Sequence, residues 1–197
     1  MSLSTVGVVG TGPSGLSIVQ AIAEADLPVV AVCVTGARRD LARKRLQKTL
    51  AMRVQNEELT EARAADILGL VTFTSDLANA RDCDLVIEST VGDVRSRRAL
   101  LATIEGTISR GSVLASNAAR SQLPQIAEAL GRRDQFLGLR FFHPATRTQL
   151  VEISSLPETA PGARFACETF CRWLGKTPVE QVDGELDLEP ARVLASI

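Results

Sequence analysis

A glycine-rich loop near the N-terminus constrains the fold of this chain more than any other feature. The loop follows the apolar run Thr5–Gly10 and precedes Pro13–Ala25, where Ile18, Ala21 and Ile22 recur on one helical stripe. The pattern G-x-G-x-x-G therefore lies between a predicted strand and a predicted helix, which is the context of a phosphate-binding loop. The loop residues are Gly10, Thr11, Gly12, Pro13, Ser14 and Gly15.

Each glycine of this loop has its own expected role. Gly10 permits the tight turn, Gly12 lets the backbone approach a pyrophosphate, and Gly15 lets the helix pack closely on the strand. The free N–H groups and the positive dipole end at the helix N-terminus favour an anion. We therefore expect a dinucleotide to bind at residues 10–15. The alternative is a glycine turn that holds no ligand.

The rest of the chain alternates short apolar runs with helical patterns. The further predicted strands are Pro28–Val34, Leu70–Phe73, Asp84–Glu88, Ser112–Ala115, Phe136–Phe142, Leu150–Ile153 and Thr177–Val182. The further predicted helices are Ala37–Leu59, Thr60–Leu68, Val94–Ile108, Leu123–Leu130 and Ala163–Leu174. Apolar strands that alternate with helices are typical of a parallel sheet covered on both faces. We predict an α/β fold of the Rossmann type, with a doubly wound, mostly parallel sheet and helices on both faces.

One domain accounts for nearly all of the 197 residues. The alternating pattern is interrupted at Asp183-Gly184-Glu185. We therefore expect a dinucleotide-binding domain over residues 1–183. Residues 184–197 are expected to form a C-terminal tail or the start of a helical domain that the chain lacks.

Composition narrows the functional classes. The net charge of −1 gives no general electrostatic case for nucleic acid. No apolar run is long enough for a membrane helix and no signal peptide is visible, so the expected location is the cytoplasm. Four cysteines without a C-x-x-C pair, and a single histidine, argue against zinc and predict reduced, mostly buried thiols. Any imidazole chemistry near neutral pH must use that histidine, His143.

The second predicted strand bears on the choice of cofactor. An acidic residue about 20 positions after the glycine loop normally holds the adenosine ribose, but Cys33 stands there instead. Arg38 and Arg39 follow, and an arginine can bind a 2′-phosphate. Either NAD or NADP is therefore expected, with both arginines on a solvated helix face as the alternative. Further cofactor contacts are expected from Thr90, Arg97 and Asn117.

The chain resembles the N-terminal, NAD-binding domain of the 3-hydroxyacyl-CoA dehydrogenase family. The resemblance runs from about Val6 to Asp183. It rests on segments that occur in the family's order: VGVVGTGPSG, LTEARAADILGLVTFTSDL, DLVIE, SVLASN, FLGLRFFHP, LVEI and LGKTPV.

The resemblance implies a catalytic arrangement that this sequence keeps only in part. In the family, the histidine of H-F-F-N-P is the general base, the glutamate of L-V-E orients it, and a serine of N-T-S-S binds the substrate oxygen. Here Arg140 stands at the histidine position, His143 at the asparagine position and Ala119 at the serine position, while Glu152 is retained. The family's acidic residue after the second strand matches Cys33, and a glutamate beside the nicotinamide matches Gly92.

These substitutions alter the expected chemistry. A guanidinium cannot act as a base at neutral pH, so Arg140 is expected to form an ion pair with Glu152. His143 could then reach the substrate oxygen as the base, with Arg140 stabilising an alkoxide. The alternative is that His143 is a loop histidine bonded to backbone. The candidate catalytic residues are thus His143, Glu152 and Arg140.

A basic helix suggests the carrier of the substrate. Its cations are Arg38, Arg39, Arg43, Lys44, Arg45, Lys48 and Arg53, offset by Asp40. Such a helix could receive the phosphates of CoA or an acidic acyl-carrier protein, or it could be a solvated face. We expect no nucleic acid or membrane partner. Without the family's helical domain, the exposed apolar face would favour a homodimer, unless it is covered by Leu186, Leu188, Val193 and Leu194.

Three functions follow. The first is an NAD(P)-dependent oxidoreductase domain that acts on a 3-hydroxyacyl or 3-oxoacyl thioester with an altered catalytic set. The alternative is a redox-inactive relative that serves as a dinucleotide-binding or interaction module. The third is a non-redox enzyme that uses the same pocket. Turnover after dinucleotide binding distinguishes the first two.

Overall fold

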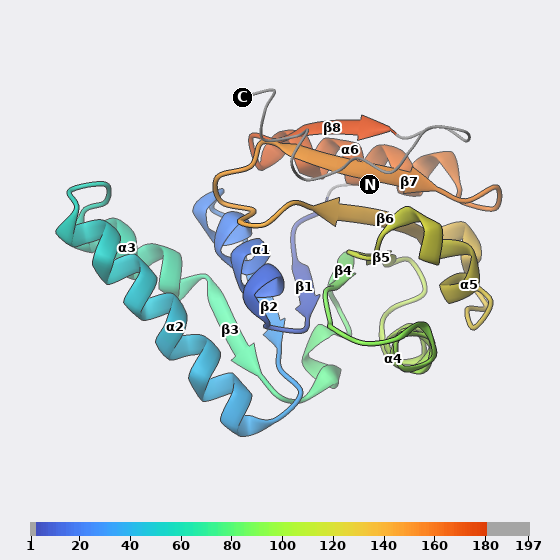
Figure 1. The fold of residues 1–197 in the computed structure, drawn as a ribbon, viewed down its shortest axis with the longest axis horizontal. Coiled ribbons are helices and arrows are strands. Elements are labelled where there is room, and N and C mark those ends of the chain that lie inside the picture. The colour runs from blue at the N-terminus through green and yellow to red at the C-terminus, as the bar shows by residue number, and fades with distance from the viewer. Residues whose placement is uncertain (1–2, 181–197) are drawn as a thin grey trace.

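The computed structural model describes residues 3–180 as one eight-stranded sheet with helices on both faces (Figure 1). The strands are β1 Val6–Val9, β2 Val29–Val32, β3 Val71–Thr74, β4 Leu85–Glu88, β5 Val113–Ser116, β6 Phe136–Phe141, β7 Leu150–Ser155 and β8 Thr177–Glu180. The helices are α1 Pro13–Glu24, α2 Gly36–Gln55, α3 Glu61–Gly69, α4 Val94–Thr107, α5 Leu123–Ala127 and α6 Pro161–Trp173. Three short 3-10 turns are η1 Leu77–Ala80, η2 Arg120–Gln122 and η3 Arg133–Gln135.

The strand order is β3-β2-β1-β4-β5-β6-β7-β8. Strands β1 to β6 are parallel to one another, whereas β7 runs antiparallel to β6 and β8 runs parallel to β7. This arrangement confirms the predicted Rossmann-type, mostly parallel sheet. The sequence pattern did not predict the direction of β7. A buried strand has the same apolar pattern whether it runs parallel or antiparallel to its neighbour.

Two hydrophobic clusters cover the two faces of the sheet. One holds residues of α1, α2, α3 and α6, including the fully buried Ile18, Leu46 and Phe170. The other holds residues of α4 and α5, including Leu101 and Ile126. Helices on both faces require strands that are apolar on both sides, which is why the strand segments read as continuous apolar runs. The doubly wound prediction is therefore confirmed.

Local capping signals place the helices close to their predicted bounds. Thr60 caps α3 by accepting a hydrogen bond from the backbone N–H of Arg63, as predicted, and Thr35 caps α2 through the N–H of Arg38. The strand predicted at Thr177–Val182 is confirmed as far as Glu180. The predicted tail at residues 184–197 lies outside the described residues. No helix within residues 3–180 is both long and apolar enough to cross a bilayer.

The strand order changes direction between β1 and β4, and this point places the candidate site. In open α/β sheets a ligand binds outside the carboxyl ends of the strands at such a switch point. The loop after β1 is the glycine loop, and the loop after β4 begins with Ser89 and Thr90. The ends of β5 and β6 follow along the same edge and bring in Asn117 and the segment around His143.

Candidate cofactor and substrate site

The glycine loop has the backbone geometry that its sequence predicts. Gly10 adopts φ +99°, and a Cβ there would lie 2.7 Å from the backbone oxygen of Ser89. A Cβ at Gly15 would lie 1.9 Å from the backbone oxygen of Gly10. Gly10 is thus required both for its positive φ and for the close approach of the β1 and β4 loops, and Gly15 for the packing of α1 on β1.

Gly12 faces open space rather than protein. A Cβ built there meets no atom within 4 Å. Gly12 is also the N-cap of α1, with extended backbone. Because the next residue, Pro13, has no N–H, the first N–H groups of the helix are those of Ser14 and Gly15. The loop therefore presents helix N–H groups beside a surface without side chains, and this geometry fits a pyrophosphate.

The end of β2 carries a thiol where a ribose-binding carboxylate is usual. The hydroxyl of Thr11 donates a hydrogen bond to Cys33 Sγ at 3.1 Å, which joins the glycine loop to β2. Burial raises the pKa of the Cys33 thiol, so the group is neutral near pH 7. The neighbouring charges belong to Arg39 and Asp40, which form an ion pair at 2.9 Å. Arg38 lies exposed in the first turn of α2.

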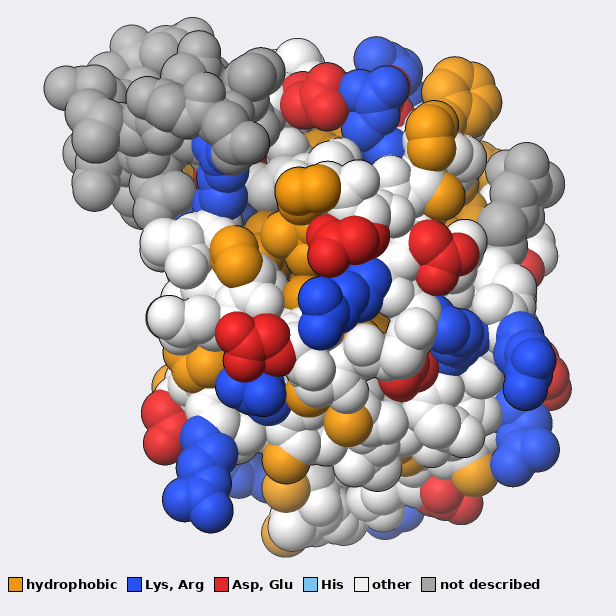
Figure 2. Space-filling view, turned by 90° about the vertical axis from the view of Figure 1, so that its right-hand side faces the viewer, with side chains coloured by type: hydrophobic (Ala, Val, Ile, Leu, Met, Phe, Trp, Pro, Cys, Tyr) orange, Lys and Arg blue, Asp and Glu red, His pale blue; other side chains and the backbone are white. Residues whose placement is uncertain are grey.

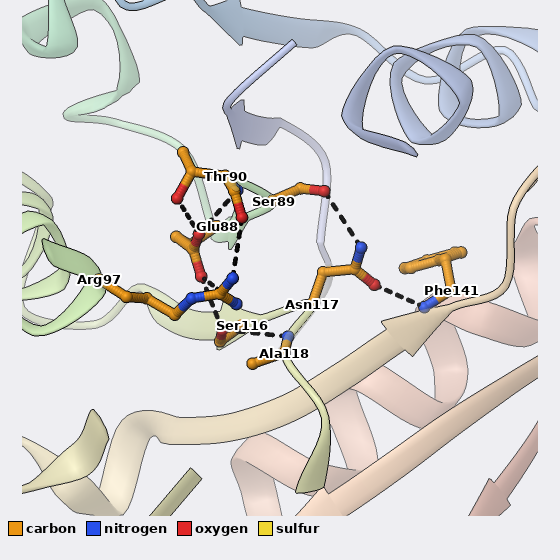
Figure 3. Close-up of polar contacts among 8 residues, drawn as sticks. All are labelled: Glu88, Ser89, Thr90, Arg97, Ser116, Asn117, Ala118 and Phe141. Carbon is orange, nitrogen blue, oxygen red and sulfur yellow. Dashed lines mark hydrogen bonds and ion pairs between the residues drawn. The ribbon is translucent and has the colours of Figure 1, made fainter. Parts of the chain in front are cut away.

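A buried carboxylate, Glu88, organises the end of β4 (Figure 3). One carboxylate oxygen accepts hydrogen bonds from the backbone N–H and the hydroxyl of Thr90, and the other accepts from the Ser116 hydroxyl at 2.7 Å. Arg97, which is nine-tenths buried, lies 3.4 Å from the second oxygen and donates to the Thr90 carbonyl at 2.9 Å. Thr90 and Arg97 were predicted to contact the cofactor, and the structure shows that both are held by Glu88.

Asn117 connects three strand ends along the same edge (Figure 3). Its side-chain amide donates to Ser89 Oγ at 3.1 Å, and its side-chain oxygen accepts from the backbone N–H of Phe141 at 2.8 Å. The ends of β4, β5 and β6 are thereby fixed relative to one another. Asn117 thus lies between the loop after β4 and the segment that carries Arg140 and His143.

Arg140 and Glu152 form the predicted ion pair. The two residues are direct partners in the antiparallel pairing of β6 and β7, and Arg140 Nη1 lies 3.5 Å from Glu152 Oε2. Glu152 is 1% exposed and also accepts a hydrogen bond from the Ser154 hydroxyl at 3.1 Å. The Arg140 guanidinium further lies 5.2 Å from the ring centre of Phe142. Arg140 is therefore held as a fixed cation.

His143 lies in the loop after β6 and contacts α1, the helix that follows the glycine loop. Its Nδ1 lies 3.3 Å from the hydroxyl oxygen of Ser17 in α1. Ser17 also donates to the carbonyl of Ser14 at 2.8 Å and accepts from the backbone N–H of Ala145 at 3.1 Å. The structure thus gives His143 a side-chain partner on α1. It also brings the candidate base close to the helix that begins at the glycine loop.

Sequence reasoning did not select Glu88 or Ser17. A carboxylate that ends an otherwise apolar strand, as in DLVIE, is a signal that could have indicated Glu88. Ser17 has no comparable signal, because a single serine within a helical pattern does not by itself indicate a functional site. All four cysteines are buried and free, as predicted. Within residues 3–180, no group of three His, Cys, Asp or Glu side chains is arranged to hold a metal ion.

The fold, the glycine loop and the switch point together define a Rossmann-type dinucleotide-binding domain. The family model for the 3-hydroxyacyl-CoA dehydrogenase, NAD binding domain, matches residues 5–184. The chain therefore belongs to this family, in agreement with the resemblance of its motifs.

Relatives of known sequence agree with this assignment. A probable 3-hydroxybutyryl-CoA dehydrogenase of Deinococcus radiodurans is 33% identical over 174 residues, which are 88% of this chain and 62% of that protein. A fatty acid oxidation complex subunit alpha of Psychrobacter cryohalolentis is 28% identical over 177 residues, which are 90% of this chain and 25% of that protein. The chain thus spans about a quarter to three fifths of the length of these relatives.

Solved structures show the same architecture. FadB2 of M. tuberculosis superposes with a TM-score of 0.92 at 31% identity, over 98% of this chain and 68% of that chain. The (S)-3-hydroxybutyryl-CoA dehydrogenase PaaH1 of Ralstonia eutropha superposes with a TM-score of 0.85 at 29% identity, over 91% of this chain and 63% of that chain.

Proposed function

We propose that this chain binds NAD(H) or NADP(H) at residues 10–15 and serves the oxidation or reduction of a 3-hydroxyacyl or 3-oxoacyl thioester. One observation carries the proposal: the loop that holds the open N-cap at Gly12 meets the loop after β4 at Gly10 and Ser89, at the switch point of the sheet. Fluorescence titration with NADH and with NADPH tests the first part. Saturable binding of at least one is expected, and the absence of both would refute the cofactor proposal.

The choice between the two dinucleotides depends on the end of β2. Cys33 is neutral and therefore does not repel a 2′-phosphate, as a carboxylate would. Arg38 lies exposed in the first turn of α2, close in sequence to this strand end. We propose that NADP(H) is accepted alongside NAD(H). Arg38→Ala is expected to weaken NADPH binding by about tenfold, equivalent to one charge-assisted contact, and to leave NADH binding unchanged.

The residues of the chain divide the chemistry as follows. A bound nicotinamide supplies or accepts the hydride. In the oxidative direction His143 takes the proton of the 3-hydroxyl group as the hydride leaves the carbon that bears this hydroxyl. In the reductive direction His143 returns the proton to the oxygen. Arg140, held by Glu152, stabilises the negative charge that develops on the substrate oxygen. His143→Ala is expected to abolish turnover while cofactor affinity is retained, and unchanged turnover would contradict this role.

A redox-inactive module is the second candidate function. A specific observation favours it: the family's histidine and serine positions hold Arg140, which is engaged with Glu152, and Ala119, which has no hydroxyl. In that case the dinucleotide binds and no hydride transfer follows. Oxidation of NADH or NADPH by acetoacetyl-CoA separates the two functions. Binding without any turnover would establish the module and refute the enzyme.

Helix α2 supplies a site for the substrate's carrier. Five exposed cations on it, which are Arg38, Arg43, Lys44, Arg45 and Lys48, form no ion pair with any residue in 3–180. By contrast, acidic and basic side chains are interspersed on the face over α4 and α5 (Figure 2). We propose that the α2 cations attract either the phosphates of CoA or the acidic surface of an acyl-carrier protein.

Charge reversal tests the role of α2. Arg45→Glu combined with Lys48→Glu is expected to raise the KM for the acetoacetyl thioester of the true carrier about tenfold and to leave kcat unchanged. Arg110→Glu, at another exposed arginine, is the matched control. Equal KM values in the variant and the control would refute this role. We further propose that the protein is cytoplasmic and forms a homodimer, which fractionation and light scattering respectively test.

A further inference from the structure

Ser17 and His143 form a contact that nothing in the glycine motif requires. Ser17 lies in the second turn of α1, is 9% exposed, and its Oγ lies 3.3 Å from His143 Nδ1. The two residues are 126 positions apart in the sequence. His143 itself is exposed, so one edge of its ring is anchored against α1 while the ring remains accessible.

The other two hydrogen bonds of Ser17 determine the direction of this contact. A serine hydroxyl has one proton to donate and two lone pairs that accept. The proton goes to the Ser14 carbonyl at 2.8 Å, and one lone pair accepts the Ala145 N–H at 3.1 Å. Only an acceptor position remains for His143. The proton of the neutral imidazole must therefore lie on Nδ1, and the lone pair must lie on Nε2.

From this geometry we propose that Ser17 is a positioning residue that fixes His143 in the Nδ1-protonated tautomer, with Nε2 as the proton acceptor. Within residues 3–180, no hydrogen-bond partner competes for Nε2. The same Nδ1–H bond persists when Nε2 gains a proton, so the ring keeps its orientation through a proton transfer. The role as a base rests on the proposed function; the tautomer does not.

Ser17 lies in α1, so the contact that fixes this tautomer is made by the helix that follows the glycine loop. Ser17 bonds to Ser14, which belongs to the glycine loop, and to Ala145, which follows the histidine segment. One hydroxyl therefore joins the phosphate loop, the loop after β6 and the imidazole. Any displacement of α1 would also displace Ser17 and hence the imidazole that it contacts. This arrangement replaces the imidazole–carboxylate contact that the Arg140–Glu152 pair excludes.

Nitrogen-15 NMR tests the tautomer without any activity measurement. Because His143 is the only histidine of the chain, its two ring nitrogens give one assignable set of signals. At about pH 9, where an ordinary imidazole is neutral, a protonated Nδ1 and a non-protonated Nε2 are expected. The opposite pattern would overturn the proposal. This readout stays decisive even if the protein catalyses no turnover.

Variants test whether Ser17 is the cause. Ser17→Ala is expected to convert His143 to a tautomer mixture or to the Nε2-protonated form, whereas Ser17→Thr retains the hydroxyl and the wild-type pattern. Ser112→Ala is the matched control, because Ser112 is also buried and donates to a carbonyl, that of Cys83, at 2.7 Å. The control is expected to alter stability without altering the His143 spectrum. An unchanged spectrum in Ser17→Ala would refute the positioning role.

Kinetics extend the test if turnover is found. Ser17→Ala is expected to lower kcat about tenfold, less than the 10²–10⁴-fold loss for removing a base, with little change in the KM for the dinucleotide. The pH profile of kcat is expected to shift in Ser17→Ala and not in Ser112→Ala. A fall in both kcat and thermal stability that Ser112→Ala reproduces would show a merely structural role and refute the proposal.

Discussion

Arg140 and Glu152 face each other across β6 and β7, with Arg140 Nη1 3.5 Å from Glu152 Oε2. This pair occupies the place where the family resemblance implies an imidazole and its orienting carboxylate. A guanidinium keeps its proton at any physiological pH, so the pair cannot exchange a proton with substrate. In the proposed enzyme we assign the proton-transfer role to His143, three residues further on.

Loss of the Arg140 charge is expected to destabilise the fold. Arg140→Met removes the guanidinium that lies 3.5 Å from the Glu152 carboxylate, which is 1% exposed, and should lower the free energy of unfolding by about 2–4 kcal/mol. Urea denaturation measures the change. Arg98→Met is the control, because the Arg98–Glu128 pair is exposed and should contribute less than about 1 kcal/mol. Equal losses in both variants would contradict the prediction.

Two glycine substitutions in the same loop should behave differently. Gly12→Val adds a side chain in open space, so stability should hold while the affinity for the dinucleotide falls at least about 100-fold. Gly15→Ala places a methyl group 1.9 Å from the Gly10 carbonyl, so both stability and binding should be lost. Melting temperatures and NADH or NADPH titrations of the two variants provide the comparison. A destabilised Gly12→Val protein would argue against the open N-cap.

Glu88 is expected to stabilise the fold and to hold the residues at the end of β4 in place. Glu88→Gln removes the charge opposite the buried Arg97 and replaces an acceptor of three hydrogen bonds, so a loss of about 3–5 kcal/mol is expected. Thr90→Val removes only one hydroxyl from the same network and should lose about 1 kcal/mol. Denaturant titration measures both changes. A Glu88→Gln protein as stable as Thr90→Val would show that the carboxylate charge is not required.

Buried thiols predict a loss of stability in alkali. Burial raises the pKa of Cys83 to about 11 and that of Cys171 to about 12, both above the ordinary value of 9.0. A raised folded-state pKa stabilises the fold fully below pH 9, and this contribution disappears as the pH rises through the folded value. For Cys83 the loss of stability is expected between about pH 9 and the folded-state pKa of about 11.

A cysteine variant isolates this effect. Cys83→Ala removes the titrating thiol, so its free energy of unfolding should fall less between pH 9 and 11 than that of the wild type. The chain has no tyrosine, which removes one competing titration in this range. Urea titrations at pH 8, 9, 10 and 11 provide the measurement. Parallel curves for the two proteins would show that Cys83 does not titrate with unfolding.

Local patterns predicted the elements more completely than the contacts between them. The bounds of α1, the cap at Thr60 and the strand at DLVIE were predicted because each depends on residues within one or two turns. The Arg140–Glu152 pair was also predicted, since charge and the family's motif order place both residues at one site. The antiparallel direction of β7 was not predicted, because an apolar strand pattern is the same in either direction.

The amino-acid sequence by itself determined the strand, the glycine loop and the helix that follows it, and therefore the class of cofactor. Those features arise from backbone conformation and local hydrophobic periodicity, which neighbouring residues control. Only the tertiary structure decided that Glu88 holds Arg97, that Asn117 joins three strand ends and that Ser17 orients His143. These contacts join residues from separate elements, because the parallel sheet brings their carboxyl ends to one edge.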